Sequence, residues 1–303
     1  MTLLRLAHLS DPHLFTPLPP PTLGEWLSKR GLSRSSWMRV RQHLQRPEVL
    51  HAAVADIHAH APDHLLITGD VTNFSLPTEF AAAAAWFATL GEPGNVSVIP
   101  GNHDALVPVP FTESWAHWLP WMQGDSPGAL ATPLPYVRVR GGVALIGLSS
   151  AVPTLPTFAS GTLGPEQLQW LAAQLPLLKA QGLFRIVMLH HPPADGVVSA
   201  RKVLTDRAAL RAVLKAQGAE LVLHGHSRDA RFDPLPGPQG LIASFGLPSI
   251  SAIPNPHDEG ARWHLLEIAR SDAGWRVKVT VRALDASHSG FATAARYTLE
   301  IST

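Results

Sequence analysis

Cysteine is absent from the 303 residues of this chain. Its absence excludes a disulfide framework and thiolate metal ligands, so a metal site here would be built from His, Asp and Asn side chains. Charge is also scarce, because 16% of the residues are charged and the net charge is +1. A chain this close to neutral has no strong overall field, which disfavours nucleic acid as a partner.

Long apolar runs are missing as well. No stretch approaches 18 uninterrupted apolar residues, so the sequence predicts no membrane-spanning helix. The N-terminal residues lack a basic region followed by a long apolar run, and we expect no signal peptide. We therefore expect a cytoplasmic protein, with peripheral contact to the inner membrane surface left open.

Hydrophobic residues make up 46% of the chain, which is enough to bury a large core in one big domain or two small ones. Short apolar runs predict strands over residues 3–9, 64–68, 96–100, 143–148, 184–189 and 220–223. Helical patterns cover residues 47–60, 77–90, 165–180 and 206–217. This alternation predicts an α/β sheet. Further on, antiparallel strands are expected over residues 241–245, 263–269, 275–283 and 297–301, which predicts a second sheet packed on the first.

Five clusters of metal-ligand residues lie in order along the chain, each where a predicted strand gives way to a loop. They are Asp11-Pro12-His13, Gly69-Asp70, Gly101-Asn102-His103-Asp104, His190-His191-Pro192-Pro193 and His224-Gly225-His226. Taken alone, Asp11 suits a turn and Asp70 suits a turn or a helix cap. Open α/β sheets place their sites beyond the carboxyl ends of strands, so the five clusters together predict a pocket for two metal ions.

In this order the clusters resemble the pattern of the calcineurin-like metallophosphoesterases, which is D-x-H, G-D, G-N-H-[DE], H and G-H-x-H. The match spans residues 11 to 228. The resemblance implies a four-layer αββα sandwich of two mixed β-sheets flanked by helices, formed as a single domain over residues 1–303.

The resemblance also implies a ligand set. Asp11 and His13 would bind a first metal ion, and Asp70 would bridge both ions. Asn102, His190 and His226 would bind the second ion. We prefer His190 to His191 because the family ligand commonly lies two places before a proline, as His190 does here.

The implied chemistry needs two divalent ions, of manganese, iron or zinc, whose bridging hydroxide attacks phosphorus in line with the leaving oxygen. His103 would stabilise the transition-state charge or protonate the leaving group, and Asp104 would orient its imidazole. His191 is expected to be structural or adjacent to substrate. His224 fits a place behind the ligands and a place in the core equally well.

One position departs from the family pattern, because Arg228 stands where the family has a second His. The first metal site then keeps only Asp11, His13 and Asp70 from the protein. Water, Asp229 or His224 could fill the gap, the first ion could bind weakly, or Arg228 could contact phosphate directly through its planar fork. We predict a first site that is weakened but occupied.

A cap-like insertion is predicted at about residues 16–46. Its part from residue 26 to residue 46 has no acidic residue and six basic ones, which are Lys29, Arg30, Arg34, Arg39, Arg41 and Arg46. It could be a solvated helical excursion, a cap that grips an anionic substrate, or a segment that rests on an anionic membrane surface. We expect the opposite wall of the pocket to be formed by Trp115, Trp118, Pro120 and Trp121.

The resulting hypothesis is a metal-dependent phosphodiesterase that acts on a small phosphoester. The resemblance is to the cyclic-nucleotide and glycerophosphodiester branches of the family. A nucleotide-sugar lipid pyrophosphatase is an alternative, because of the basic and aromatic insertion. Since Arg228 replaces a ligand, a catalytically weak or silent scaffold with this fold is a further alternative.

Overall fold

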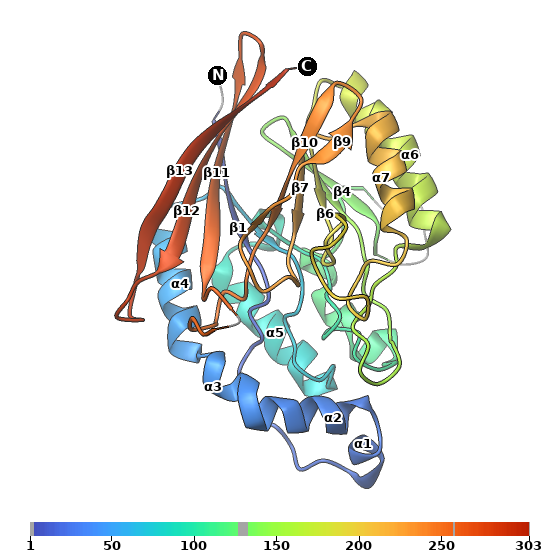
Figure 1. Ribbon diagram of the computed structural model, residues 1–303, viewed down its shortest axis with the longest axis vertical. Coiled ribbons are helices and arrows are strands. Elements are labelled where there is room, and N and C mark those ends of the chain that lie inside the picture. The colour runs from blue at the N-terminus through green and yellow to red at the C-terminus, as the bar shows by residue number, and fades with distance from the viewer. Residues whose placement is uncertain (1–2, 127–132, 257, 303) are drawn as a thin grey trace.

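The computed structural model describes residues 3–126, 133–256 and 258–302. Two β-sheets face each other across the middle of the molecule (Figure 1). The first sheet contains, in spatial order, β13 (Phe291–Ser302), β12 (Gly274–Leu284), β11 (Arg262–Ser271), β1 (Leu4–Leu9), β2 (His64–Ile67) and β3 (Val96–Val98). The second contains β4 (Tyr136–Arg140), β5 (Val143–Gly147), β6 (Phe184–Met188), β7 (Leu221–His224), β10 (Gly240–Gly246) and β8 (Arg231–Phe232), with β9 (Leu235–Gly237) paired to β10.

Helices cover the outer sides of both sheets, which confirms the four-layer αββα arrangement (Figure 1). Helices α4 (Pro47–Ala59) and α5 (Pro77–Leu90) pack on the first sheet, and α6 (Gly164–Ala180) and α7 (Arg207–Gln217) pack on the second. Each of α4 and α5 begins at a proline, where the missing N–H costs no helical hydrogen bond.

The parallel strands carry the ligand loops. Strands β1, β2 and β3 are parallel neighbours, as are β5, β6 and β7. Every residue of β2, β3, β6 and β7 is buried. Continuous burial is typical of parallel strands that are covered on both faces, and it explains their unbroken apolar runs. The predicted strands and helices are confirmed within two residues at each end, except that β13 begins at Phe291 rather than at residue 297.

The expectation that the C-terminal strands build the second sheet is wrong. Strands β11, β12 and β13 extend the first sheet, because β11 pairs antiparallel with β1. Strand β10 joins the second sheet and lies parallel to β7. The second sheet therefore begins at β4, which the sequence did not reveal. Alternation of apolar residues identifies a strand but does not specify which strand lies beside it.

The insertion lies beyond the carboxyl ends of the parallel strands, at the bottom of Figure 1. It consists of α1 (Leu23–Trp26), α2 (Lys29–Ser36), a π-helix η1 (Trp37–Arg41) and α3 (Gln42–Leu44). The described residues also form three short 3₁₀ segments, η2 (Pro93–Asn95), η3 (Phe111–Glu113) and η4 (Trp115–Trp121). Within the described parts of the chain, no helix is long and apolar enough to cross a membrane.

Candidate metal centre

Five loops bring the predicted ligands together from both sheets. In the first sheet, β1, β2 and β3 end just before Asp11, Asp70 and Asn102. In the second sheet, β6 and β7 end just before His190 and His226. All five side chains are buried, as is His13. Because the parallel strands of each sheet end at the same edge, ligands that lie far apart in the sequence converge on one point.

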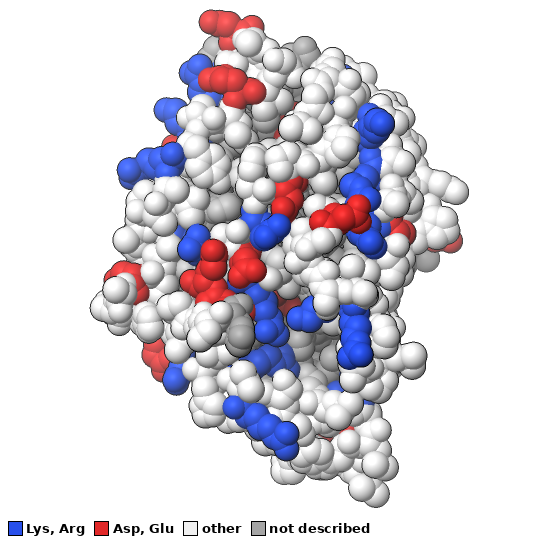
Figure 2. Space-filling model, in the orientation of Figure 1, with Lys and Arg blue, Asp and Glu red and all other residues white. Residues whose placement is uncertain are grey.

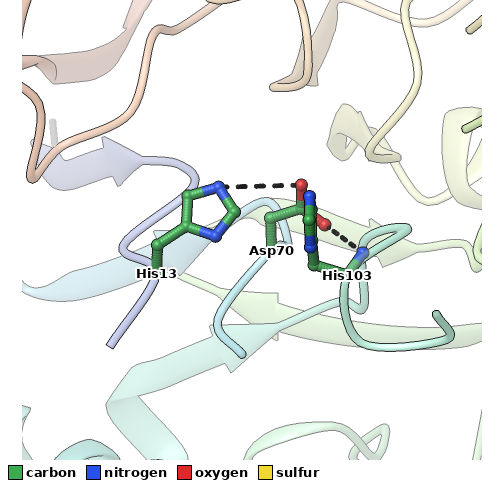
Figure 3. A group of neighbouring side chains, drawn as sticks. All are labelled: His13, Asp70 and His103. Atoms are coloured by element: carbon green, nitrogen blue, oxygen red, sulfur yellow. Dashed lines mark hydrogen bonds and ion pairs between the residues drawn. The ribbon is translucent and has the colours of Figure 1, made fainter. Parts of the chain in front are cut away.

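Asp70 lies at the centre of this cluster. Its Oδ2 atom is 3.4 Å from Nε2 of His190 and 3.9 Å from Nε2 of His13, and its Oδ1 accepts a 2.7 Å hydrogen bond from the backbone N–H of His103. Figure 3 shows His13 and His103 on either side of the Asp70 carboxylate. Among the residues that the structure describes, two groups of side chains could each hold a metal ion, and both contain Asp70. His13, Asp70 and His103 form one group, and Asp70, His190 and His226 form the other.

The histidines are oriented as metal ligands require. Nδ1 of His190 lies 2.7 Å from the Thr68 carbonyl oxygen, and Nδ1 of His13 lies 3.3 Å from that of Thr72. A carbonyl oxygen only accepts, so each Nδ1 carries a proton and Nε2 is left to face Asp70. Metal-binding histidines usually donate their other ring N–H in this way. The donor set of imidazoles and carboxylates therefore fits divalent ions such as manganese, iron or zinc.

The other two predicted ligands of the second ion, Asn102 and His226, lie close to His190. Oδ1 of Asn102 is 3.2 Å from Nε2 of His190. The ring of His226 lies 5.1 Å from that of His190, and its Nε2 is 3.0 Å from the Lys202 carbonyl oxygen. That bond leaves Nδ1 of His226 as the nitrogen available to a metal. Asp11 lies on the opposite side, with its Oδ1 atom 4.0 Å from Nε2 of His13.

Burial and mutual charge shift the pKa of each acidic group here. Burial raises the pKa of Asp11 to about 6, although His190 opposes the rise. Burial raises the pKa of Asp104 to about 7, and the negative charge of Asp70 adds to the rise. Burial would also raise the pKa of Asp70, but the imidazoles of His190 and His103 hold it well below its usual range. A bound divalent cation would take over the role of the imidazolium and relieve the crowded negative charge.

The backbone is strained at the same residues. Positive φ angles are found at Asp11 (51°), His13 (44°), Asp70 (54°) and His226 (67°). Residues other than glycine rarely adopt this left-handed conformation, and each such residue costs of the order of 1 kcal/mol. Four of the predicted ligands thus share an uncommon backbone geometry, and such strain is typically concentrated at functional sites.

Two motif glycines allow the loops to approach each other closely. A Cβ atom on Gly101 would collide with the carboxylate and backbone of Asp70. A Cβ atom on Gly225 would collide with the side chains of Ser10 and Asp11. Glycine at these two positions is therefore a requirement of packing around the carboxylates.

The comparison with known proteins agrees with this geometry. A profile described as calcineurin-like phosphoesterase matches residues 4–228. The chain belongs to the calcineurin-like phosphoesterase family. A relative named as a probable cyclic nucleotide phosphodiesterase, from Synechococcus sp., is 28% identical over 240 residues, covering 78% of this chain and 84% of the relative.

Two solved structures share the fold. A dimetal phosphatase from Danio rerio superposes with a TM-score of 0.56 at 13% identity, covering 96% of this chain and 98% of that one. The purple acid phosphatase PPD1 from yellow lupin (Lupinus luteus) seeds superposes with a TM-score of 0.63 at 12% identity. That match covers 98% of this chain and 53% of the lupin chain. At these identities the likeness concerns the arrangement of the sheets and helices.

Within this calcineurin-like phosphoesterase, Asp104 does not orient His103, so that prediction is wrong. The Asp104 carboxylate accepts hydrogen bonds from the backbone N–H groups of Val71, Thr72 and Gly101 and from the Thr72 hydroxyl. The His103 imidazole is held instead by Asn73, whose carbonyl oxygen lies 2.8 Å from its Nδ1. Asp104 therefore ties two ligand loops together. A backbone carbonyl carries no residue-type information, so the sequence could not show this partner.

His191 and His224 lie outside both metal groups found among the described residues. His191 uses both ring nitrogens elsewhere, with Nδ1 2.7 Å from the Ser150 hydroxyl and Nε2 3.1 Å from the Ala159 carbonyl oxygen. Its ring lies 4.5 Å from that of His226. His224 is fully buried, and its Nδ1 lies 3.1 Å from the Gly225 carbonyl oxygen. Both histidines thus support the ligand loops from behind.

Arg228 lines the cavity above the proposed ligands together with Asp258. Its side chain is 54% exposed, and its Nε atom lies 3.9 Å from Oδ1 of Asp258. Its backbone also adopts a positive φ angle, of 68°. In the described chain, Asp229 and His224 belong to neither metal group, and Asp11 also lies outside both, whereas His103 belongs to the first group.

A cavity of about 260 Å³ opens over the cluster. The insertion forms one wall with Ser36, Val40, Arg41, Leu44 and Gln45, and the other side is lined by Lys202, Arg228, Pro248, Ser249 and Ala252. Figure 2 shows Lys and Arg side chains gathered in the lower middle of the molecule, above helix α2. The cavity therefore combines a floor of metal-ligand residues with a rim that carries three cations, Arg41, Lys202 and Arg228, and the carboxylate of Asp258.

The predicted tryptophan wall is wrong. Trp118 and Trp121 are buried in the core, where both rings pack against Phe87. Pro120 is exposed, and Trp115 lines a second, apolar cavity of about 680 Å³. The position of these residues just after a ligand loop in the sequence does not determine whether their side chains face the cavity or the core. Lys202 takes that place on the wall, and no motif marked it.

Proposed function

We propose that this protein is a metal-dependent phosphodiesterase that hydrolyses a small phosphoester with two divalent ions held around Asp70. The observation that carries the proposal is the presence of Asp70 in both groups that could hold a metal ion. A carboxylate shared by two adjacent cations offsets their mutual repulsion, which is its usual role in binuclear phosphoesterases. The dimetal phosphatase among the structural neighbours supports the same interpretation.

Each ligand would have a defined part. Asp11, His13 and Asp70 would hold the first ion, while Asp70, Asn102, His190 and His226 would hold the second. When bound, the ions would acidify a water to a nucleophile and neutralise the charge of the phosphate oxygens. The buried loops fix the ligands, because the Asp104 carboxylate joins the Gly101 turn to residues 71 and 72.

Substrate size and charge follow from the cavity. Its volume of about 260 Å³ suits a small molecule rather than a polymer. The rim cations Arg41, Lys202 and Arg228 would attract an anion before it reaches the metals. The Synechococcus relative named as a probable cyclic nucleotide phosphodiesterase supports a phosphodiester as the substrate class. The insertion at residues 16–46 would act as a cap on this cavity.

A test joins metal content with turnover. The protein is reconstituted with manganese, its metal content per chain is measured, and hydrolysis of bis(4-nitrophenyl) phosphate is followed. Two ions per chain together with turnover are the expected result. One ion or none, with no turnover at any manganese concentration, would instead favour the scaffold alternative.

A lipid-linked substrate is a second candidate, favoured by the surface of the insertion. Leu23 and Leu27 are 76% and 82% exposed in and beside α1, close to the basic residues of α2. Exposed apolar side chains next to basic ones are typical of contact with an anionic membrane surface. Sedimentation with phosphatidylglycerol vesicles tests it, comparing Leu27→Ser with Leu241→Ser, which changes an equally exposed leucine in β10. Equal sedimentation of both variants and the parent would exclude this docking surface.

A further inference from the structure

Arg41 brings a positive charge from the insertion into the metal cavity. Its Nη1 atom lies 3.0 Å from Nε2 of His103, and its Nη2 atom donates to the backbone and hydroxyl oxygens of Ser33 at 3.1 and 2.8 Å. Burial lowers the pKa of Arg41 to about 10, so the guanidinium is still charged at neutral pH. The charge is therefore fixed in position beside the residue that follows Asn102.

Arg41 forms no ion pair with any described residue, although the charges of Asp70 and Glu79 act on it from a greater distance. Among the described residues its buried Nε atom has no hydrogen-bond partner. The buried Arg185 behaves differently, because it pairs with both carboxylate oxygens of Glu220 and donates to two backbone carbonyls. A buried guanidinium that lacks a counter-ion is costly unless an anionic ligand completes it.

The local backbone also singles out this position. Helix α2 continues into the π-helix η1, and Arg41 is its last residue. π-helical turns are rare and occur mostly at functional sites. Each contains one more residue per hydrogen-bonded turn than an α-helix, which rotates the following side chains about the helix axis. Arg39 lies in the same turn but is exposed. The two arginines thus face opposite environments within one turn of helix.

The contacts of His103 with Asn73 and Arg41 also define its tautomer. Nδ1 of His103 lies 2.8 Å from the Asn73 carbonyl oxygen, which only accepts, so the ring proton sits on Nδ1. Nε2 is then an acceptor, and it receives the N–H of Arg41. In this arrangement His103 holds the guanidinium in place and has no proton to give from Nε2.

We propose that Arg41 is a catalytic residue that binds a non-bridging oxygen of the substrate phosphate, with His103 as the residue that positions it. The inference rests on the proposed phosphodiesterase function and deepens it. The second N–H of Nη1 is the donor for this bond, because Nη2 donates twice to Ser33 and Nε is buried. A hydrogen bond from a guanidinium to a phosphate oxygen is charge-assisted and therefore strong. The ligand class is a phosphate ester anion, and inorganic phosphate, which carries the same non-bridging oxygens as the phosphomonoester product, would bind in the same place.

The kinetic test uses Arg41→Ala, with Arg39→Ala as the matched control from the same turn. Removing one donor to the transition-state charge costs about 10²- to 10³-fold in kcat. We expect that loss for Arg41→Ala on bis(4-nitrophenyl) phosphate, with unchanged manganese content, and parent-like kcat for Arg39→Ala. Added guanidinium chloride at low concentration should restore part of the turnover of Arg41→Ala, which a merely structural defect would not allow. Parent-like turnover by Arg41→Ala would overturn the proposal.

A second measurement keeps the test independent of turnover. Inorganic phosphate is titrated calorimetrically into the manganese-loaded parent and variants, and Arg41→Ala should bind it about tenfold more weakly. Arg41→Gln replaces Arg41→Ala if the latter does not fold. A parent that binds phosphate but hydrolyses nothing would count against the phosphodiesterase alone. Equal phosphate affinity in the parent and the Arg41 variant would count against the role of Arg41.

Discussion

Nε2 of His190 lies 3.4 Å from Oδ2 of Asp70, and this contact joins the two sheets. Asp70 follows β2 of the first sheet, and His190 follows β6 of the second. Burial would lower the pKa of His190, but the carboxylates of Asp70 and Asp11 raise it to about 10. Without metal the two sheets are thus joined here by a protonated imidazole, and a divalent ion bound by both residues would replace it.

Metal binding should therefore stabilise the whole fold. A ligand that binds only the folded state adds about 2.7 kcal/mol when present at 100 times its Kd. We expect the thermal midpoint of the metal-free protein to rise on addition of manganese and to fall again with a chelator. Asp70→Asn should lose most of this rise, bind fewer ions and show no turnover. Asp272→Asn, which changes an exposed carboxylate in the β11–β12 turn, should respond like the parent. An equal rise for both variants would argue against Asp70 as the shared ligand.

Asp104→Asn is predicted to weaken the fold rather than the chemical step alone. The Asp104 carboxylate accepts from three backbone N–H groups and one hydroxyl, and an amide NH₂ would face at least one of these donors. Hydrogen bonds to buried charged groups contribute about 1.5–3 kcal/mol each, so a loss of about 3 kcal/mol is expected. Urea unfolding of the metal-free protein at pH 8, above the pKa of about 7 of Asp104, measures this loss. Unchanged stability together with a large loss of kcat would restore the original assignment of Asp104 to His103.

How far the site follows from the sequence depends on what kind of contact is involved. The convergence of Asp11, Asp70 and Asn102 on one cavity could be predicted, because each follows a strand whose apolar run is complete in itself. The partner of β10 could not, because pairing with β7 is a long-range choice between strands of similar pattern. The partners of Asp104 cannot be predicted for a related reason, since they are backbone N–H groups that any residue type other than proline supplies.

Arg41 shows a different limit. Its segment was recognised from six basic residues, but nothing in the sequence distinguishes Arg41 from Arg39. The π-helix η1 places Arg41 at the cavity and Arg39 at the exposed surface. Lys202 had no pattern around it at all. A residue that lines a cavity from a loop far away in the sequence can be identified only from the three-dimensional structure.

Buried histidines away from the metal should make the protein sensitive to acid. Burial, aided by the charge of Arg262, lowers the pKa of His264 to about 3, from an ordinary value of 6.5. The folded state then binds fewer protons than the unfolded state, so this contribution to stability is complete above pH 6.5 and is lost as the pH falls toward 3. The slope is at most about 1.4 kcal/mol per pH unit for one such group.

The variant His264→Gln isolates that contribution. The free energy of unfolding of the metal-free protein is measured from pH 7 down to pH 4. We expect a smaller pH dependence in His264→Gln than in the parent, even though the variant is less stable at pH 7. The control His117→Gln changes an exposed histidine and should keep the slope of the parent. Identical slopes in all three proteins would mean that His264 can be protonated without unfolding.

Arg228→His tests whether the first metal site is weakened by its missing ligand. Asp11, His13 and Asp70 are the proposed protein ligands of that site, and the Nε atom of Arg228 lies 3.9 Å from Oδ1 of Asp258. A histidine would restore a neutral imidazole donor and remove a positive charge near the ion, and both changes favour binding. We expect the weaker of two manganese Kd values to fall about tenfold, equal to about 1.4 kcal/mol. The control Arg39→His adds a histidine to the insertion and should leave both Kd values unchanged. A titration of Arg228→His that matches the parent would mean that solvent already completes the site, and Arg228 would then be free to serve the substrate.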